Sequence, residues 1–293
     1  METAVVSNAD FLATVAEKSD GAALRGDYTH ADDQYVVQQD WAAYTEAEHA
    51  LWRQLYQRQE ALLPGRACDE FIEALHQMDA ADGIPQFERT SEALFQATGW
   101  RIVAVPGLIP ELAFFNHLAN RRFPVTVWLR SPAEFDYIVE PDVFHDFFGH
   151  VPLLFNPVFA DYMQRYGQGG LKAMQLGGLD NLARLYWYTV EFGLINTPQG
   201  LRIYGAGILS SGGEVEYCLK PGSGARHIHL EIERCLRTLY KIDSYQESYF
   251  VIDSYQQLFD GTAPDFAPLY QKLKALPLLP ANTLLPGEVE LLG

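Results

Sequence analysis

The chain has 293 residues, and its 38 Asp and Glu against 21 Lys and Arg give a formal net charge of −17. Such an excess of negative charge repels nucleic-acid phosphates and anionic lipid head groups, and no basic cluster offsets it, since the densest basic pair is Arg121-Arg122. The composition, 48% hydrophobic and 13% aromatic, excludes a disordered chain. We therefore expect a globular protein whose partners include no nucleic acid and no membrane.

The cysteines and the first residues of the chain bear on the compartment. Cys68, Cys218 and Cys235 are an odd number of cysteines without a CxxC motif, which is typical of a reducing compartment. The first twenty residues contain Glu2 and Asp10 and no long apolar segment, so they do not resemble a secretory signal. No stretch approaches the ~18 consecutive apolar residues of a membrane helix. We expect a cytoplasmic protein.

The domain organisation follows from the missing linker. No Gly/Ser-rich or Pro-rich segment divides the middle of the chain, which favours one domain. Residues 1–30 mix small and polar side chains without a sustained period and are expected to form a loose N-terminal arm. Residues 31–275 are expected to form the domain, and the Leu- and Pro-rich residues 276–293 an extended tail.

The first half of the domain is expected to be mostly helical. Thr45 is a plausible N-cap with Glu48 three positions further on, and the apolar residues that follow recur every three to four positions until Pro64-Gly65. Further helices are expected over residues 68–78, 91–98 and 112–118, and short strands over residues 100–105 and 125–130.

The second half of the domain is also expected to be mostly helical with short strands. Helices are expected from Pro141 to about His150, over residues 157–166 before a Gly-rich connection, and over residues 180–192, 230–239 and 255–258. Residues 202–204 and 214–219 suggest a small hairpin. The predicted fold class is mainly α with small β elements, an α+β fold.

Two histidines lie five positions apart within residues 141–152. On an ideal α-helix this spacing separates two side chains by about 140°, too wide for one metal ion. Pro152 disfavours helical geometry in the residue before it, and Gly149 permits a distorted last turn, so we expect the helix to unwind at His150 and turn its imidazole back toward His145. An imidazole in such apolar surroundings needs a hydrogen bond or a metal, and two hydrogen-bonded core histidines remain an alternative.

Glu191 lies in the most hydrophobic helix of the chain, and no Lys or Arg lies three or four positions from it. A lone carboxylate there costs several kcal/mol unless a cation or strong donors compensate it. Two neutral imidazoles and one carboxylate form the facial triad of non-haem Fe(II) oxygenases. We therefore predict that His145, His150 and Glu191 bind a divalent metal ion, with Fe(II) as the first candidate.

Two other classes of protein use similar ligands. A catalytic Zn²⁺ hydrolase has His₂Glu ligation, although its usual HExxH spacing is absent from this segment. A binding protein could use the same residues as a structural metal site, although such sites usually close with four protein ligands.

Several longer blocks make the pattern specific. They are Glu140-Pro141-Asp142 with His145-Asp146-Phe147-Phe148-Gly149-His150-Val151-Pro152, then Tyr186-Trp187-Tyr188-Thr189-Val190-Glu191-Phe192-Gly193-Leu194, then Tyr204-Gly205-Ala206-Gly207-Ile208-Leu209-Ser210-Ser211 with Tyr217-Cys218-Leu219. On these blocks the chain resembles the pterin-dependent aromatic amino acid hydroxylases, and most closely their bacterial members that act on phenylalanine. The similarity extends from about Tyr35 to about Tyr270.

The resemblance implies the catalytic-domain fold of that family, with Fe(II) and a tetrahydropterin such as tetrahydrobiopterin as cofactors and L-phenylalanine and O₂ as substrates. The implied catalytic and metal residues are His145, His150 and Glu191. The implied substrate contacts are Arg130, which binds the carboxylate, Asp142, which holds Arg130, and Trp187, Phe192, Gly207 and Ser210. The implied pterin contacts are Gly107, Leu108, Ile109, Phe114, Asp146 and Glu214, the last also near the iron.

The resemblance also bears on the choice among aromatic amino acids, for which tyrosine and tryptophan hydroxylases of the same family are the alternatives. Trp187 opposes tryptophan, because the tryptophan enzymes have a smaller ring there. Ile242 falls where the tyrosine enzymes carry an aspartate, so we expect an apolar side chain facing the site, although a shift of one position would bring Asp243 there. A buried phenol without a partner would cost roughly 1–3 kcal/mol, which favours phenylalanine.

Two departures from the family's animal members are expected to matter. Ile138 replaces a threonine whose hydroxyl helps to hold the substrate carboxylate, so that contact is in doubt. We expect neither their regulatory domain nor their oligomerising helix, because too few residues lie at either end for them. The prolines after Leu276 also oppose a coiled coil. A monomer or a weak dimer is expected, with the monomer favoured.

Overall fold

Local capping signals place the first long helix where the sequence predicts it. In the computed structural model of the chain, which describes residues 25–291, Thr45 and Glu48 form a reciprocal capping box at the start of α2 (Glu46–Leu62). The helix α4 (Phe87–Thr98) ends at Gly99, whose φ of 76° is left-handed. Both predicted helices are therefore confirmed.

The elements alternate long helices with short strands, and the predicted fold class is confirmed. The helices are α2 (Glu46–Leu62), α3 (Asp69–Gln77), α4 (Phe87–Thr98), α5 (Glu111–Ala119), α6 (Pro157–Leu176), α7 (Leu179–Tyr186), α8 (Ala206–Leu209), α9 (Gly212–Cys218), α10 (Ile232–Arg237), α11 (Tyr255–Thr262) and α12 (Ala267–Leu273). The strands are β1 (Arg101–Val105), β2 (Arg122–Thr126), β3 (Leu194–Thr197), β4 (Gly200–Ile203), β5 (Arg226–His229) and β6 (Ser248–Ile252). Two π-helices, η4 (Phe144–His150) and η6 (Trp187–Glu191), and the 3₁₀ turns η1 (Tyr28–His30), η2 (Trp41–Ala43), η3 (Pro132–Glu134) and η5 (Pro152–Phe155) complete the order.

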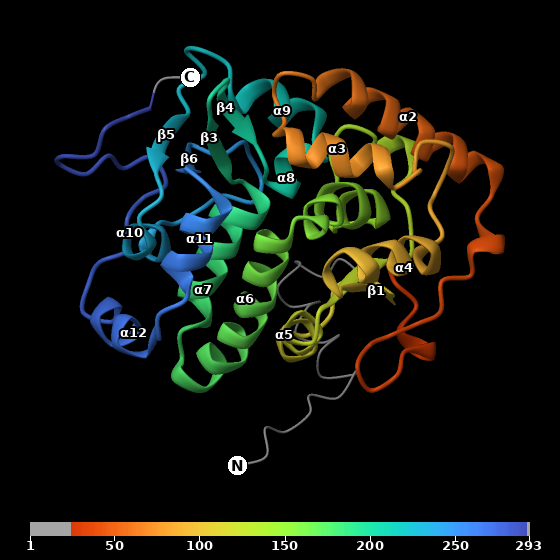
Figure 1. Ribbon diagram of the computed structural model, residues 1–293, viewed down its shortest axis with the longest axis horizontal. Coiled ribbons are helices and arrows are strands. Elements are labelled where there is room, and N and C mark those ends of the chain that lie inside the picture. Colours follow the sequence, from red (N-terminus) through yellow and green to blue (C-terminus); the bar gives the residue numbers. More distant parts are fainter. Residues whose placement is uncertain (1–24, 292–293) are drawn as a thin grey trace.

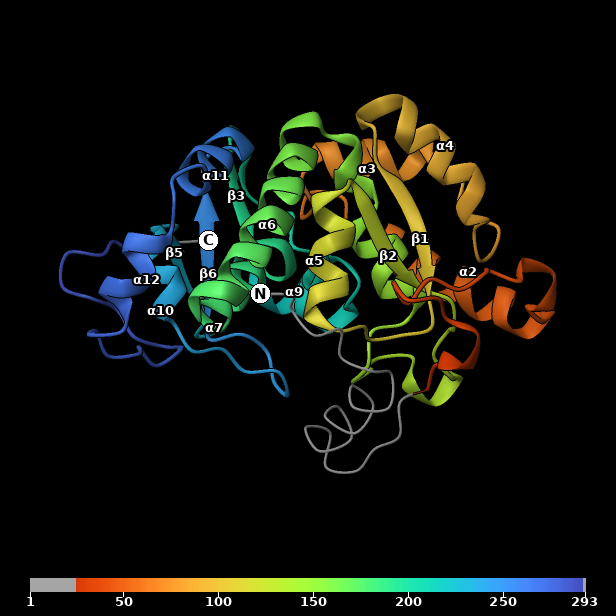
Figure 2. The same cartoon turned by 90° about the horizontal axis from the view of Figure 1, so that it is seen from below.

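The strands form two separate small sheets. β1 and β2 pair in parallel, and the second sheet has the order β4-β3-β6-β5, in which the β3–β4 pair is antiparallel and the others are parallel. Figures 1 and 2 show α6 in the middle of the molecule, between the two sheets, and α7 beside it, next to the four-stranded sheet. Because η4 precedes α6 and η6 follows α7, this central layer carries both segments that hold the predicted metal ligands.

Three local predictions are wrong, and the first fails because of tertiary packing. The Gly-rich residues after Tyr166 do not end the helix, because α6 continues to Leu176. A Cβ on Gly167 would lie 2.4 Å from the backbone N of Ala119, and one on Gly170 2.0 Å from the ring of Phe115, so these glycines allow α5 to approach α6 closely.

The two remaining errors concern strands. β2 spans Arg122–Thr126, so the chain has left the sheet before the alternating residues 127–130. Residues 214–219 lie in and just after α9 instead of a hairpin, because Ser211 accepts a hydrogen bond from the Glu214 backbone and caps that helix.

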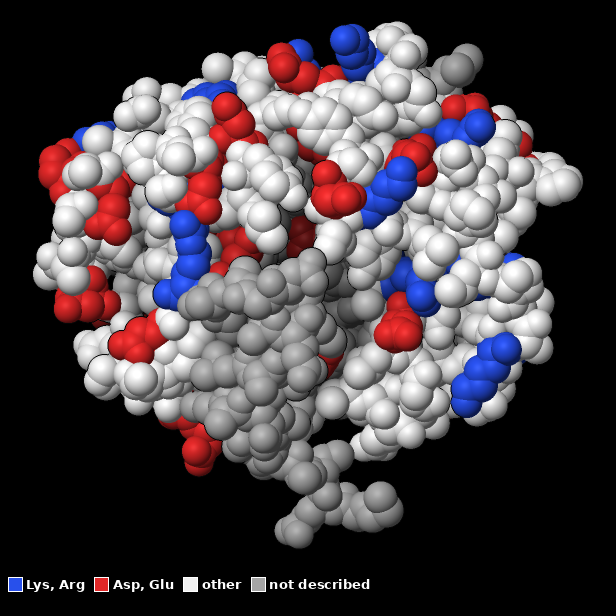
Figure 3. Space-filling model, turned by 180° about the vertical axis from the view of Figure 1, so that it is seen from behind, with Lys and Arg blue, Asp and Glu red and all other residues white. Residues whose placement is uncertain are grey.

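The two ends of the described chain pack onto the domain. Most of the predicted arm lies outside the described residues, but Tyr28 is buried against Ile109 and Ala113. In the predicted tail, Leu279 and Glu290 form isolated β-bridges with Thr238 and Ile228. On the face in Figure 3, Lys and Arg lie singly among acidic side chains and form no continuous basic patch. No helix within residues 25–291 is long and apolar enough to cross a membrane.

Candidate active site

His145 and His150 meet because the segment that carries them is a π-helix. In η4 (Phe144–His150), backbone hydrogen bonds join residues five positions apart, so side chains at that spacing follow one another on one face. Their Nε2 atoms lie 3.2 Å apart. The predicted unwinding at His150 is therefore wrong, whereas the predicted meeting of the two imidazoles is confirmed.

Tertiary packing stabilises this unusual helix. The side chains of Phe144, Phe147 and Phe148 are fully buried in the core. Gly149 faces α8, where a Cβ would lie 2.9 Å from the carbonyl oxygen of Ala206, so only glycine fits without displacing that helix. The wide π-turn is thus held by core packing and by a close backbone approach.

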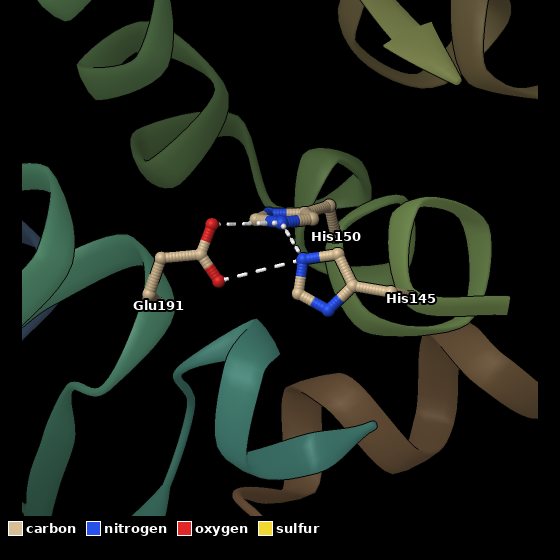
Figure 4. Close-up of side chains that lie close together, drawn as sticks. All are labelled: His145, His150 and Glu191. Atoms are coloured by element: carbon tan, nitrogen blue, oxygen red, sulfur yellow. Dashed lines mark hydrogen bonds and ion pairs between the residues drawn. The ribbon is translucent and has the colours of Figure 1, made fainter. Parts of the chain in front are cut away.

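Glu191 is the last residue of the second π-helix, η6, which directly follows α7 in the chain. Its Oε1 lies 3.2 Å from Nε2 of His150, and its Oε2 lies 3.6 Å from Nε2 of His145. Figure 4 shows the three side chains pointing toward one another from two separate segments. Gly207 lies against the carboxylate, since a Cβ there would lie 3.1 Å from Oε2.

Hydrogen bonding selects the tautomer of His145. The Ser210 hydroxyl lies 2.9 Å from the Ala206 carbonyl and 3.0 Å from Nδ1 of His145. Because a carbonyl can only accept, the hydroxyl donates its one hydrogen there and accepts from Nδ1–H of the imidazole. Nε2 of His145 then carries a lone pair and faces the other two residues of the cluster.

The pKa values of this cluster suit metal ligation. Burial lowers the pKa of His145, which favours the neutral form of its imidazole. Burial would raise the pKa of Glu191, but the facing imidazoles of His150 and His145 outweigh burial and hold that pKa below its usual value. Neutral imidazoles and an ionised carboxylate are the forms that bind metals.

The donor set fits a divalent ion. Within residues 25–291, the potential ligand atoms of His145, His150 and Glu191 all lie within 4.8 Å of one another. Ligand atoms about 2.1 Å from an ion and at right angles lie about 3 Å apart, which is close to the observed separations. A cation between three such groups would be held by all of them, and two imidazoles with one carboxylate are the protein ligands of both non-haem Fe(II) sites and catalytic zinc sites.

A buried ion pair lies beside this cluster. Nε and one terminal nitrogen of Arg130 each donate to Asp142 at 2.9 Å, in a two-pronged pair that is buried on both sides. Asp142 also accepts from the backbone N–H of Arg130 at 2.9 Å and from that of His145 at 3.0 Å. The carboxylate therefore fixes the arginine and the start of η4 together.

Aromatic rings close to Glu191 in the chain, with one ring from a distant loop, form what we call the aromatic side of the site. The ring centroids of Trp187 and Phe192 lie 4.7 Å apart, and Tyr240 stacks on Trp187 at 4.3 Å and 16°. The indole N–H of Trp187 donates to Gln246 at 2.9 Å. Sequence reasoning missed Gln246 and Tyr240, because the buried Gln246 and the partly buried Tyr240 follow no local period that could have revealed them.

The predicted pterin residues form two groups. Phe114 contacts Tyr186 edge-to-face, with centroids 5.8 Å apart, and Tyr186 lies 6.2 Å from His150. The loop that contains Gly107, Leu108 and Ile109 is held by the Tyr28 hydroxyl, which donates to the Leu108 carbonyl at 2.7 Å. Tyr28 lies in the predicted N-terminal arm, and sequence reasoning missed its contact.

The two predicted acidic residues are both anchored. Asp146 accepts from the backbone N–H of Thr126 at 2.8 Å, and burial raises its pKa. Glu214 is 4% exposed and accepts from the Tyr249 hydroxyl and from the backbone N–H of Gln246, and burial raises its pKa as well.

The specificity position behaves differently from its prediction. The side chain of Ile242 is 72% exposed, so it does not face the site as the sequence predicts. In the same segment, Tyr240 stacks on Trp187 and Gln246 accepts a hydrogen bond from it.

Comparisons with known proteins agree with this geometry. Residues 22–269 match the family described as biopterin-dependent aromatic amino acid hydroxylase. The chain is 59% identical over 277 residues to the phenylalanine-4-hydroxylase of Ralstonia nicotianae, an alignment that covers 94% of this chain and 86% of that protein. It is 61% identical over 246 residues to the phenylalanine-4-hydroxylase of Chromobacterium violaceum, covering 84% and 82%.

A solved structure is similar over nearly the whole chain. The crystal structure of the Chromobacterium violaceum phenylalanine hydroxylase with iron and phenylalanine bound superposes with a TM-score of 0.84 at 55% identity, covering 94% of this chain and 98% of that chain. A further structure of that hydroxylase, with oxidised Fe(III) bound, has a TM-score of 0.87 at 57% identity, covering 90% and 96%.

Proposed function

The chain belongs to the family of biopterin-dependent aromatic amino acid hydroxylases, and from this we propose that it is an iron-dependent monooxygenase that converts L-phenylalanine to L-tyrosine with O₂ and a tetrahydropterin. The family resemblance inferred from the sequence blocks is thereby confirmed. The observation that carries the proposal is the convergence of His145, His150 and Glu191 from two π-helices in a chain so similar to phenylalanine hydroxylases.

The three metal ligands hold and position the iron, and none of them needs to react with the substrate. His145, His150 and Glu191 would hold the iron, which together with the tetrahydropterin would supply the activation of O₂. Three protein ligands on one face leave the remaining coordination positions open to small molecules. Ser210 supports this arrangement, because its hydroxyl fixes the ring orientation and tautomer of His145.

Substrate binding is assigned to the buried arginine and the aromatic side. Arg130 would bind the carboxylate of phenylalanine, with Asp142 holding the guanidinium in a fixed plane. Trp187 and Phe192 would enclose the substrate ring, which excludes water from the reacting carbon. Gly207 and Ser210 would lie near the amino-acid end.

Pterin binding is assigned to the side of the centre near β1 and α5. Phe114 would stack on the pterin ring, and the loop of Gly107, Leu108 and Ile109 would contact its edge. Asp146 would reach the pterin through water, and Glu214 would lie on the far side near the iron. These acids support the site without acting as nucleophiles.

One experiment separates this function from a zinc hydrolase. Oxygen uptake and pterin oxidation should require Fe(II), tetrahydropterin and phenylalanine together, with tyrosine as the product. Comparison of kcat/KM for phenylalanine, tyrosine and tryptophan should favour phenylalanine. Peptide or ester hydrolysis with Zn²⁺ and no oxygen uptake would contradict the proposal.

The setting of the enzyme is part of the proposal. The three cysteines are free and buried, which supports a reducing, cytoplasmic compartment. We propose a monomer, and light scattering at micromolar concentration should give the mass of one chain. A stable tetramer would contradict this.

A further inference from the structure

The loop from Tyr240 to Tyr245 borders the aromatic side of the proposed site, yet much of it is open to solvent. Ile242 is 72% exposed and Tyr245 is 48% exposed. Tyr240 nevertheless lies flat on Trp187, with ring centroids 4.3 Å apart. An exposed loop keeps such a stacked geometry only if something fixes both the loop and the indole.

Gln246 contacts both. Its side chain is 2% exposed, and Oε1 accepts from the indole N–H of Trp187 at 2.9 Å. Nε2 donates to the backbone carbonyls of Lys241 at 2.8 Å and of Ser244 at 3.4 Å. An indole nitrogen can only donate and carbonyls can only accept, so one orientation of the amide satisfies all three contacts.

The backbone of Gln246 is fixed independently. Its N–H donates to Oε1 of Glu214 at 3.2 Å, and the same oxygen accepts from the hydroxyl of Tyr249 in β6. The amide therefore projects from a rigid, buried point at the start of a sheet strand. Its oxygen contacts Trp187 and its nitrogen contacts the loop, so this one side chain joins the two.

We propose that Gln246 is a positioning residue that determines substrate specificity, by locking the ring of Trp187 and the loop of Tyr240–Tyr245 into one arrangement. The inference rests on the proposed function, in which Trp187 encloses the aromatic ring of the substrate. A ring pocket with a fixed wall discriminates by size, whereas a wall that can turn admits a larger ring.

Gln246→Glu tests the loop half of this clamp. At neutral pH it retains an acceptor for the indole but loses both donors to the loop carbonyls. We expect KM for phenylalanine to rise about five- to tenfold, as for the loss of one or two hydrogen bonds, with KM for the pterin changed less than about twofold. The kcat/KM ratio of phenylalanine to tryptophan should fall by a similar factor.

Trp187→Phe tests the other half. It keeps an aromatic wall but removes the N–H group that donates to Gln246. As in Gln246→Glu, KM for phenylalanine should rise and the kcat/KM ratio of phenylalanine to tryptophan should fall. The double variant should shift them less than the two single effects combined, because both changes break one network.

Proteolysis reports on the loop without any turnover. The carbonyl of the Lys241–Ile242 bond is the one that Nε2 of Gln246 binds, and trypsin cleaves after lysine. The Gln246→Glu variant should be cleaved there about tenfold faster than the wild type, because freeing that carbonyl opens the loop locally.

Gln164→Glu is the matched control. Gln164 likewise accepts from a side-chain N–H, that of Arg121 at 2.9 Å, and donates to a backbone carbonyl, that of Ala119 at 3.0 Å, but it lies on α6. This control should leave the substrate ratio and the cleavage at Lys241 unchanged. Equal behaviour of the two Gln→Glu variants would overturn the inference, as would unchanged substrate ratios in Trp187→Phe. A wild type without hydroxylase activity would instead refute the proposed function, while the cleavage rates would still decide whether Gln246 holds the loop.

Discussion

Two buried groups of charged side chains lie beside the same π-helix and differ in how their atoms are matched. Arg130 and Asp142 are complementary, with two donors meeting two acceptors at 2.9 Å. His145, His150 and Glu191 instead bring three groups that can each donate an electron pair to a metal within 3.2–3.6 Å of one another. The first pair can remain buried with its own charges balanced, whereas the second group needs a cation from outside.

The difference separates a residue that orients from residues that bind. Asp142 uses both oxygens on the protein itself, so its effect on a ligand passes through Arg130. Glu191 keeps its oxygens for the centre of the cluster, so its effect is direct.

Removing the Glu191 carboxylate should have the largest effect on function and a small effect on the metal-free fold. In Glu191→Ala, iron affinity should fall by more than about a thousandfold, because loss of a residue that merely supports a ligand already costs about 10–100-fold. Glu191→Gln keeps the volume and should also weaken the metal. Iron titration and thermal unfolding of the metal-free proteins measure the two effects, and wild-type iron affinity in Glu191→Ala would refute the ligand assignment.

Removing Asp142 should do the opposite and destabilise the fold itself. Asp142→Ala leaves the guanidinium of Arg130 buried without its partner, for which we expect a loss of about 3–5 kcal/mol in the free energy of unfolding. Urea denaturation of metal-free protein measures it, with Glu191→Ala as the control. A loss below about 1 kcal/mol would mean that water reaches the guanidinium of Arg130 and compensates its charge.

Changing Arg130 tests the orienting role. Arg130→Lys keeps the charge but loses the two-pronged geometry, so KM for the amino acid should rise by the equivalent of about 1.5–3 kcal/mol. KM for the pterin should change far less. Steady-state kinetics with each substrate varied in turn measures both, and equal changes would indicate a structural role for Arg130.

The smallest expected effect comes from a buried acid that belongs to neither group. Burial raises the pKa of Glu214 above the value of about 4.3 in the unfolded chain, so its stabilising contribution is complete below that pH and is lost as pH rises through the raised pKa. Glu214→Gln cannot ionise, so its stability relative to wild type should improve over that interval by about 1.4 kcal/mol for each pKa unit. Unfolding curves between pH 4 and 7 measure this, and a difference independent of pH would contradict the raised pKa.

Short-range hydrogen bonding made part of the fold predictable. Thr45 and Glu48 cap α2 with groups three positions apart, and Gly99 ends α4 in a conformation that glycine favours, so neighbouring residues contain the whole signal. The types of the metal ligands were predictable for a related reason. Glu191 stands without a cation in an apolar helix, and its own surroundings in the sequence show that it needs one.

The contacts that complete the site are decided by the tertiary structure. A π-helix gives up the usual helical hydrogen-bond pattern, and the packing of Gly149 on Ala206, distant in sequence, stabilises it here. The same holds for Gln246, which lies two residues before β6 and whose amide joins Trp187 to a loop. Residue types and local spacing thus determined which chemistry the chain can hold, whereas contacts between distant segments decided where each group points, because their free energy exists only once the core has formed.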